Sequence, residues 1–261
     1  MKISLAIAGK GGTGKTTLSA MFVRALRETD VRPVLAVDAD PNSCLAEALG
    51  VEPGRLLADI REQSSSPEGA PPGEIGRVRA VEDEVHRAIA EAEGFDLITM
   101  GQPEGPRCYC YVNTLLRKSL KDVAKNYESM VLDNEAGMEH LSRRTTDDVD
   151  FLIAVMNPTL PSFRAVRRIL ALADNLPINI GHRVVLVNRA GPDGAGPRFE
   201  GELAKLGAAR VPDVPEDAEV EQAGAVGRDV FSLSEGNAAL AAVKNVINSL
   251  RAALSPAREN R

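Results

Sequence analysis

The stretch that decides the fold of this chain reads Gly9-Lys10-Gly11-Gly12-Thr13-Gly14-Lys15-Thr16, with Thr17 directly after it. It matches the pattern G-x-x-x-x-G-K-[ST]. An apolar run over residues 3–8 precedes the stretch, and apolar residues at helical spacing follow it over residues 18–26. A strand, a glycine-rich turn and a helix in this order predict a loop whose backbone N–H groups hold phosphate oxygens at a helix N-terminus.

Each residue type in this loop suits the binding of a nucleoside phosphate. The glycines allow backbone N–H groups to turn inward, Lys15 is expected to reach the β- and γ-phosphates, and the Thr16 hydroxyl is expected to ligate Mg²⁺. The residues predicted to contact the nucleotide here are Gly11, Gly12, Thr13, Gly14, Lys15, Thr16 and Thr17.

Apolar runs recur along the rest of the chain. They cover residues 33–37, 95–100, 130–132, 151–156 and 184–187, mostly with helical windows between them. This alternation predicts a mostly parallel, doubly wound α/β sheet with helices on both faces, within one domain over residues 1–261. Residues 64–80 are rich in Ser, Pro and Gly and are predicted to form an exposed loop, and the last helix is predicted over about 235–254.

The composition suits a globular domain and excludes several classes of protein. The chain has 261 residues, 44% hydrophobic and 26% charged, and a net charge of −6. An acidic chain without an evident basic patch predicts no nucleic-acid partner. No window approaches the roughly 18 apolar residues of a membrane span, and the first apolar run is too short for a secretory signal. We expect a soluble, cytoplasmic protein with no membrane partner.

Carboxylates follow two of the predicted strands. Asp38 and Asp40 come at the end of the second strand, and Asp133 closes the run over residues 129–132 in the manner of a Walker B strand. Because α/β sheets bind ligands at the carboxyl ends of their strands, these groups can orient a water molecule and hold the shell of Mg²⁺. The alternative for the Asp-Pro pair at 40–41 is an ordinary turn.

Two cysteines separated by one residue, Cys108 and Cys110, are candidates for binding a metal. Two thiolates supply half of a four-coordinate site, and the same two cysteines of a second chain would complete it in a twofold dimer. Four thiolates suit Zn²⁺ in a tetrahedral arrangement or Ni²⁺ in a square-planar one. The alternatives are small packed side chains, a redox disulfide or adventitious metal binding. Cys44 stands alone and is interpreted as buried filler, and His140 is interpreted as a capped or surface residue.

The sequence GKGGTGKT resembles the deviant phosphate loop of the MinD/ParA/nitrogenase-iron-protein class of ATPases. The resemblance implies a nucleotide-dependent homodimer in which Lys10 reaches the nucleotide of the partner subunit. It also implies that Asp40 positions the attacking water, that Asp38 acts near the metal and that Gly137 approaches the γ-phosphate. Asn188 ends a strand without the N-K-x-D pattern that reads guanine, so the resemblance implies an adenine contact; capping the next loop is its alternative role.

Three segments resemble the CooC-type ATPases that mature the nickel site of carbon monoxide dehydrogenase. They are GKGGTGKTT (residues 9–17), GQPEGPRCYCYVN (residues 101–113) and LDNEAGMEHLSRR (residues 132–144). The middle segment distinguishes this branch from the wider class. The resemblance implies that Cys108 and Cys110 bind Ni²⁺ or Zn²⁺ at the dimer interface, that ATP is hydrolysed, and that carbon monoxide dehydrogenase is the client.

Two other functions compete with this interpretation. A positioning or switch ATPase of the MinD/ParA type would act on a membrane or DNA, but the C-terminal helical window has few cations and no aromatic residue. An electron-transfer iron protein would need cysteines from two separate segments. Cys44 is the one cysteine outside the Cys-x-Cys pair, so that interpretation is the weakest of the three.

Overall fold

The computed structural model describes residues 3–64, 74–101, 110–135, 148–176, 178–194 and 197–258. Cys108, Gly137 and His140 therefore lie outside the described residues. The strands are β1 Ile3–Gly9, β2 Val34–Ala39, β3 Ala90–Ala92, β4 Phe95–Thr99, β5 Ser129–Asn134, β6 Asp148–Met156, β7 Asn179–Val187 and β8 Ala209–Arg210. The helices are α1 Lys15–Arg27, α2 Leu45–Ala48, α3 Leu57–Ser64, α4 Glu74–Arg87, α5 Cys110–Ala124, α7 Leu160–Ala173, α8 Pro197–Leu203, α9 Ala218–Ala225 and α10 Ala238–Arg258.

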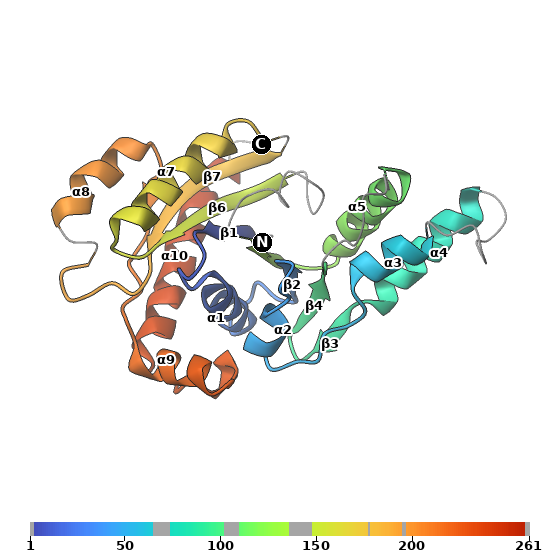
Figure 1. Ribbon diagram of the computed structural model, residues 1–261, viewed down its shortest axis with the longest axis horizontal. Helices are drawn as coiled ribbons and strands as arrows, with labels where there is room; N and C mark the ends of the chain where they lie inside the picture. The colour runs from blue at the N-terminus through green and yellow to red at the C-terminus, as the bar shows by residue number, and fades with distance from the viewer. Residues whose placement is uncertain are drawn as a thin grey trace.

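The strands form one sheet in the order β3-β4-β2-β5-β1-β6-β7-β8, shown between its helices in Figure 1. Every pairing is parallel except that between β3 and β4. β1 lies between β5 and β6. All three strands are buried almost throughout, because the strands of a parallel sheet that is covered on both faces must be apolar. The predicted mostly parallel, doubly wound fold is confirmed.

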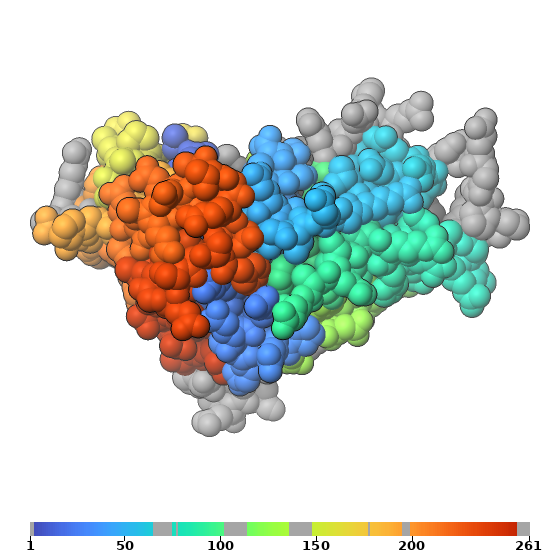
Figure 2. All heavy atoms as spheres, turned by 90° about the horizontal axis from the view of Figure 1, so that it is seen from below, coloured from blue at the N-terminus to red at the C-terminus, as the bar shows by residue number. Residues whose placement is uncertain are grey.

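Side chains of each strand alternate between two apolar layers. Leu5 and Ile7 of β1 join the layer that contains α1 and α10, whereas Ala6 and Ala8 join the layer that contains α5 and α7. This alternation follows from the two-residue period of a strand. On the β3–β4 side of the sheet, α3 and α4 lie side by side and extend outward from it (Figures 1 and 2).

Some predicted boundaries differ from the structure. The loop predicted over 64–80 is wrong in its last part, because α4 begins at Glu74. Four of the first seven residues of α4 are Arg or branched aliphatic residues, which are compatible with a helix, whereas the Pro- and Gly-rich part precedes them. The short antiparallel strand β3 and the helix α3 had no prediction, and α10 begins and ends three to four residues later than expected.

Candidate nucleotide-binding site

The phosphate loop connects β1 to α1 over residues 10–14. Thr13 closes the loop because its backbone N–H (3.3 Å) and its hydroxyl (2.8 Å) both donate to the carbonyl oxygen of Lys10. Gly14 is the N-cap of α1 with φ +84°, a left-handed conformation that L side chains rarely adopt. The free N–H groups at the start of α1 and the dipole of the helix therefore face the loop, as phosphate binding requires.

The two lysines of the loop have different environments. Lys15 is 8% exposed at the first residue of α1, and its charge acts on the buried carboxylate of Asp133. Lys10 is exposed at the start of the loop. Lys15 is therefore available to the nucleotide site of its own chain, while Lys10 is exposed to solvent.

Asn188 fixes the phosphate loop from the far side. Its side-chain amide nitrogen donates to the carbonyl oxygen of Thr13 at 2.8 Å, and its backbone N–H donates to Met156. A Cβ on Gly14 would lie 2.6 Å from the same amide nitrogen, so only glycine permits this approach. Asn188 thus joins the end of β7 to the loop, and its predicted adenine contact stays a prediction.

Asp133 ends β5 beneath the phosphate loop, where it is 1% exposed. Burial raises its pKa from 3.8 to about 6, although hydrogen bonds from Thr16 and Ser19 and the charge of Lys15 oppose that rise. The Ser19 hydroxyl donates to Oδ1 at 3.0 Å. The second oxygen, Oδ2, is buried without a hydrogen-bond partner.

This orphaned oxygen supports the prediction of a Mg²⁺ site. A buried carboxylate oxygen without a donor is costly, and a hard cation with its water shell would satisfy it. The Thr16 side chain contacts the same carboxylate. The residues present therefore fit Mg²⁺, with Thr16 as ligand and Asp133 beside it.

Asp38 holds the segment that follows β2. It is completely buried and lies opposite Asp133 in the register of β2 and β5. Its Oδ1 accepts the N–H of Asp40 at 3.1 Å, and its Oδ2 accepts the N–H of Leu45 at 2.9 Å. Burial, together with the nearby charges of Asp133 and Asp40, raises the pKa of Asp38 to about 7. Asp38 is therefore a clamp on residues 40–45, a role that the sequence did not suggest.

Asp40 is half-buried and forms a tight turn with Asn42. Its Oδ1 accepts both the backbone N–H (2.9 Å) and the side-chain amide (2.8 Å) of Asn42. These bonds fix the carboxylate at the carboxyl edge of the sheet, on the segment that Asp38 holds. The alternative interpretation, an Asp-initiated turn, is correct as local structure and is compatible with a catalytic role.

A cavity of about 300 Å³ opens beside the phosphate loop and is suited to a nucleoside. Its wall contains Gly14, Thr17, Asn188, Pro215, Asp217 and Val220. An adjoining cavity of about 250 Å³ shares Thr17 and Val220 and reaches α2, where Cys44 lines it. Cys44 is exposed, so its interpretation as buried filler was wrong; it lies just outside the apolar part of α2.

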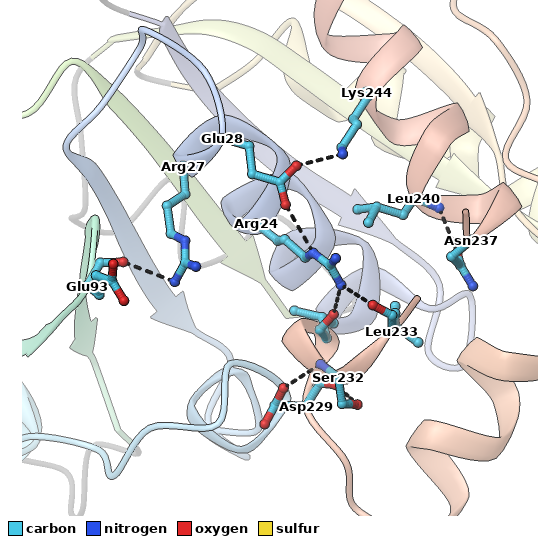
Figure 3. Close-up of polar contacts among 11 residues, drawn as sticks. Arg24, Arg27, Glu28, Glu93, Asp229, Ser232, Leu233, Asn237, Leu240 and Lys244 are labelled. Atoms are coloured by element: carbon cyan, nitrogen blue, oxygen red, sulfur yellow. Dashed lines mark hydrogen bonds and ion pairs between the residues drawn. The ribbon is translucent and has the colours of Figure 1, made fainter. Parts of the chain in front are cut away.

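Both cavities are bounded by α9, and the smaller one is also bounded by the segment that follows α9, which includes the short 3-10 helix η2 (Val230–Ser232). Figure 3 shows how α1 holds this segment. The buried guanidinium of Arg24 donates to the carbonyl oxygens of Val230 (2.5 Å) and Leu233 (2.9 Å). The carboxylate of Glu28 forms one salt bridge with Arg24 at 3.3 Å and another with Lys244 of α10 at 2.6 Å. The helix that begins at the phosphate loop therefore also fixes one wall of the smaller cavity.

A second polar cluster fixes the start of α9. Asp217 caps that helix by accepting the N–H groups of Glu219 and Val220. The buried side chain of Asn237 donates to Asp217 (2.9 Å) and to Glu219 (3.0 Å), and accepts the N–H of Leu240. Asn237 thereby links the first turn of α10 to the cavity wall.

Ser19, Arg24 and Asn237 were not identified from the sequence. Ser19 lies one turn after Lys15 on the helix, which is a usable signal for a partner of the Walker B carboxylate. Arg24 follows the apolar run over residues 20–23 of α1, and the carbonyl groups to which it donates are more than two hundred residues away in the chain. Such pairings are invisible to sequence periodicity.

The predicted thiolate site falls largely outside the described residues. Cys110 is the first residue of α5, somewhat earlier than the helix start expected near residue 112. Among the described residues, no group of three or more His, Cys, Asp and Glu side chains is arranged to hold a metal ion. The same residues include no helix that is long and apolar enough to cross a membrane.

The glycine-rich loop, the buried lysine and the carboxylate on the neighbouring strand define a P-loop nucleotide-binding α/β protein. Residues 5–230 match the CobQ/CobB/MinD/ParA nucleotide-binding domain family, and the chain belongs to that family. Binding of a nucleotide with Mg²⁺ fits the family, and so does ATPase activity.

Two relatives show what this chain is similar to. An uncharacterized ATP-binding protein of Methanocaldococcus jannaschii is 32% identical over 94% of this chain and 97% of its own length. The carbon monoxide dehydrogenase accessory protein CooC of Rhodospirillum rubrum is 35% identical over 67% of this chain and 71% of its own length.

The fold is similar to that of solved MinD proteins. The MinC:MinD cell division complex of Aquifex aeolicus superposes with a TM-score of 0.70 at 23% identity, covering 96% of both chains. MinD of Pyrococcus horikoshii, solved with Mg-ADP, gives a TM-score of 0.69 at 19% identity, covering 96% of both chains. These similarities support the architecture derived above.

Proposed function

We propose that this protein is an ATP-hydrolysing cytoplasmic metallochaperone that works as a homodimer. It binds Ni²⁺ or Zn²⁺ through Cys108 and Cys110 at the dimer interface and assists the insertion of nickel into carbon monoxide dehydrogenase. The similarity to CooC supports the client. The observation that carries the proposal is the connection between the nucleotide site and the segment that bears the cysteines.

That connection runs through the backbone of Asp38. Its carbonyl oxygen accepts the N–H of Met100 at 2.8 Å, directly before the segment that leads to Cys110. The carbonyl of Met100 in turn accepts the N–H of Ala58 at 2.9 Å. A movement of residues 40–45 on nucleotide exchange therefore acts on the residue that also anchors the metal-binding segment. Metal affinity and nucleotide affinity are then linked reciprocally.

The chain's own residues account for the hydrolysis step. The phosphate loop and Lys15 hold the nucleotide, and Mg²⁺ when bound neutralises charge on the phosphates next to Thr16. Asp40, held by Asn42, orients the attacking water in line with the terminal phosphate. Lys10, which is exposed on the loop, crosses to the nucleotide of the partner subunit and stabilises the charge of the transferring phosphoryl group.

The metal site is tested by native mass spectrometry under anaerobic conditions, with Ni²⁺ or Zn²⁺ and with or without ADP. The wild type is expected to bind one metal ion per two chains, and Cys108→Ser/Cys110→Ser to bind none. Cys44→Ser is the matched control because Cys44 is an exposed thiol in another part of the chain. Equal binding by the double variant, or none by the wild type, would leave a switch ATPase of the MinD/ParA type as the better interpretation.

The role of Lys10 is tested separately from nucleotide binding. Lys15→Ala is expected to abolish binding of a fluorescent ADP analogue, because the lysine is buried at the start of α1, where the phosphate groups are expected to bind. Lys10→Ala is expected to keep that affinity within about twofold and to lower hydrolysis by about a hundredfold or more, since a cation supplied across an interface contributes that much. A Lys10→Ala protein that hydrolyses ATP at the wild-type rate would contradict the dimeric mechanism.

A further inference from the structure

The outer face of α7 carries three arginines. The inner face of this helix is buried against β6 and β7 through Phe163, Val166, Ile169, Leu170 and Ala173. Arg164, Arg167 and Arg168 are all exposed. Because their spacing is i, i+3 and i+4, the three guanidinium groups lie together on one side of the helix. We name this set, with Leu172, the arginine face (Figure 1 shows α7 on the outside of the sheet).

Two acidic side chains of α8 and one at the end of α7 pair with other cations. Glu202 pairs with Lys205 at 2.6 Å, and Glu200 with Arg210 at 3.4 Å. Asp174, which follows the helix, pairs with Arg183 at 2.8 Å. Within the part of the chain that the structure describes, none of the three arginines forms a salt bridge, and Arg167 acts on Glu202 only through space. The arginine face is thus a concentration of positive charge in a chain of net charge −6.

An exposed apolar residue extends the same face. Leu172 lies one helical turn after Arg168 and is 47% exposed. Only two other large hydrophobic residues, Ile75 and Val226, are exposed among the residues described. Arginine is enriched at protein interfaces, and the fully buried core of an interface is more apolar than the rest of the surface, so arginines beside an exposed leucine are compatible with a docking surface.

We propose that the arginine face is a docking surface for an acidic segment of a partner protein. Carboxylates of the partner pair with Arg164, Arg167 and Arg168, and an apolar side chain of the partner covers Leu172. The planar guanidinium group is suited to this because it holds a carboxylate by two parallel hydrogen bonds.

An acidic protein fits this surface better than a nucleic acid. Proteins that bind DNA tightly neutralise about six to ten phosphates, whereas the arginine face supplies three charges in an acidic chain. A phosphate backbone offers no apolar group that could cover Leu172. The docking surface involves neither Lys10 nor the cysteine pair, so it stands or falls independently of the metallochaperone function.

The proposal is tested with the full chain and a fluorescein-labelled helical peptide. The peptide carries glutamates at i, i+3 and i+4 and a leucine one turn later; its glutamine version is the control ligand. Fluorescence anisotropy measures the affinity of the wild type and of Arg164→Ala/Arg167→Ala/Arg168→Ala at low and high salt. The matched control variant is Arg117→Ala/Lys118→Ala/Lys121→Ala, which removes the same charge from the exposed side of α5.

The arginine variant is expected to bind the glutamate peptide about tenfold more weakly at low salt, since each exposed charge pair contributes a few-fold. Leu172→Ala is expected to weaken binding several-fold at both salt concentrations. ADP affinity and thermal unfolding of each variant verify that the nucleotide site and the fold are intact. Equal peptide affinity in the α5 and α7 variants would overturn the proposal. So would a selective loss of binding to duplex DNA or to phosphatidylserine vesicles with peptide binding unchanged.

Discussion

Replacing Asp133 by asparagine is predicted to stabilise the nucleotide-free protein while removing its response to Mg²⁺. The carboxyl group is 1% exposed, and burial is the largest cause that raises its pKa from 3.8 to about 6. At pH 8 the ionised group therefore costs the folded state about 3 kcal/mol, because a difference of one in pKa between the folded and unfolded states corresponds to about 1.4 kcal/mol. Asparagine keeps an oxygen for Ser19 but leaves its amide without an acceptor, which costs about 1 kcal/mol. The net gain is about 2 kcal/mol.

The gain depends on pH with a definite sign. In the unfolded chain the group ionises near pH 4, and in the folded protein near pH 6. The folded state therefore binds the proton more tightly, and ionisation of Asp133 progressively destabilises it as the pH rises from about 4 to 6. Asparagine does not titrate, so its advantage is expected to be full at pH 8 and less than half as large at pH 5.

Thermal unfolding of the two proteins without nucleotide or Mg²⁺ measures this difference. A gain of about 2 kcal/mol corresponds to an increase of roughly 4–8 °C in Tm for a chain of this size. ADP is expected to raise the Tm of both proteins, and adding Mg²⁺ to ADP is expected to raise it further in the wild type but not in the variant. Asp150→Asn is the control, because Asp150 is only half-buried and its asparagine keeps one oxygen for the two hydrogen bonds that Ser4 donates to Oδ2, so no gain in stability is expected. A Tm below that of the wild type at pH 8, or a gain equal at pH 5 and pH 8, would refute the reasoning.

Three further substitutions test the architecture of the site. Gly14→Ala is expected to lower the free energy of unfolding by about 1–3 kcal/mol, because Gly14 has φ +84° and the added Cβ would lie 2.6 Å from the side-chain amide of Asn188. Its control is Gly11→Ala, whose Cβ meets no atom within 4 Å, and this variant is expected to change the free energy of unfolding by under about 1 kcal/mol. Arg24→Met leaves two carbonyl oxygens at η2 without their donor and is expected to cost about 2–4 kcal/mol in urea unfolding and to weaken ADP binding. Asn237→Ala removes three hydrogen bonds and is expected to lower the free energy of unfolding by about 1–3 kcal/mol. Its control, Asn245→Ala on the exposed side of α10, is expected to leave the stability unchanged. Unchanged stability of Asn237→Ala would contradict the linking role of this residue.

The sequence was sufficient for the central sheet because its signals are local. The central parallel strands are buried on both faces, so each appears as a short apolar run, and the ends of the predicted runs differ from the observed ends by at most five residues. The phosphate loop is equally local, since one turn of backbone and the start of α1 contain its whole geometry. The short edge strand β3, with the burial pattern of a partly exposed segment, gives no such run.

The polar interior of the site could not be predicted in the same way. Asp38 and Asp133 lie far apart in the chain, and only the register of β2 with β5 sets them side by side. Both oxygens of Asp38 accept backbone N–H groups because of the path that the chain takes after β2. The periodicity of the sequence does not predict that path. Cys44 was assigned to the interior on residue type alone, whereas the turn after Asp40 leaves it at a cavity wall.

The arrangement of these two carboxylates explains why a nucleotide-free site of this kind favours its ligand. Asp133 is buried with an oxygen that has no donor, beside a second buried carboxylate whose two oxygens both accept backbone N–H groups. Thr16 and Asp133 would hold a hard cation here, which would give the second oxygen of Asp133 a partner and leave both hydrogen bonds of Asp38 intact. The free energy that the nucleotide-free protein loses by burying Asp133 is thus recovered when the cation and nucleotide bind. Because the carbonyl oxygen of Asp38 also accepts the N–H of Met100, the proposed function requires that a rearrangement of residues 40–45 on nucleotide binding be transmitted to Met100.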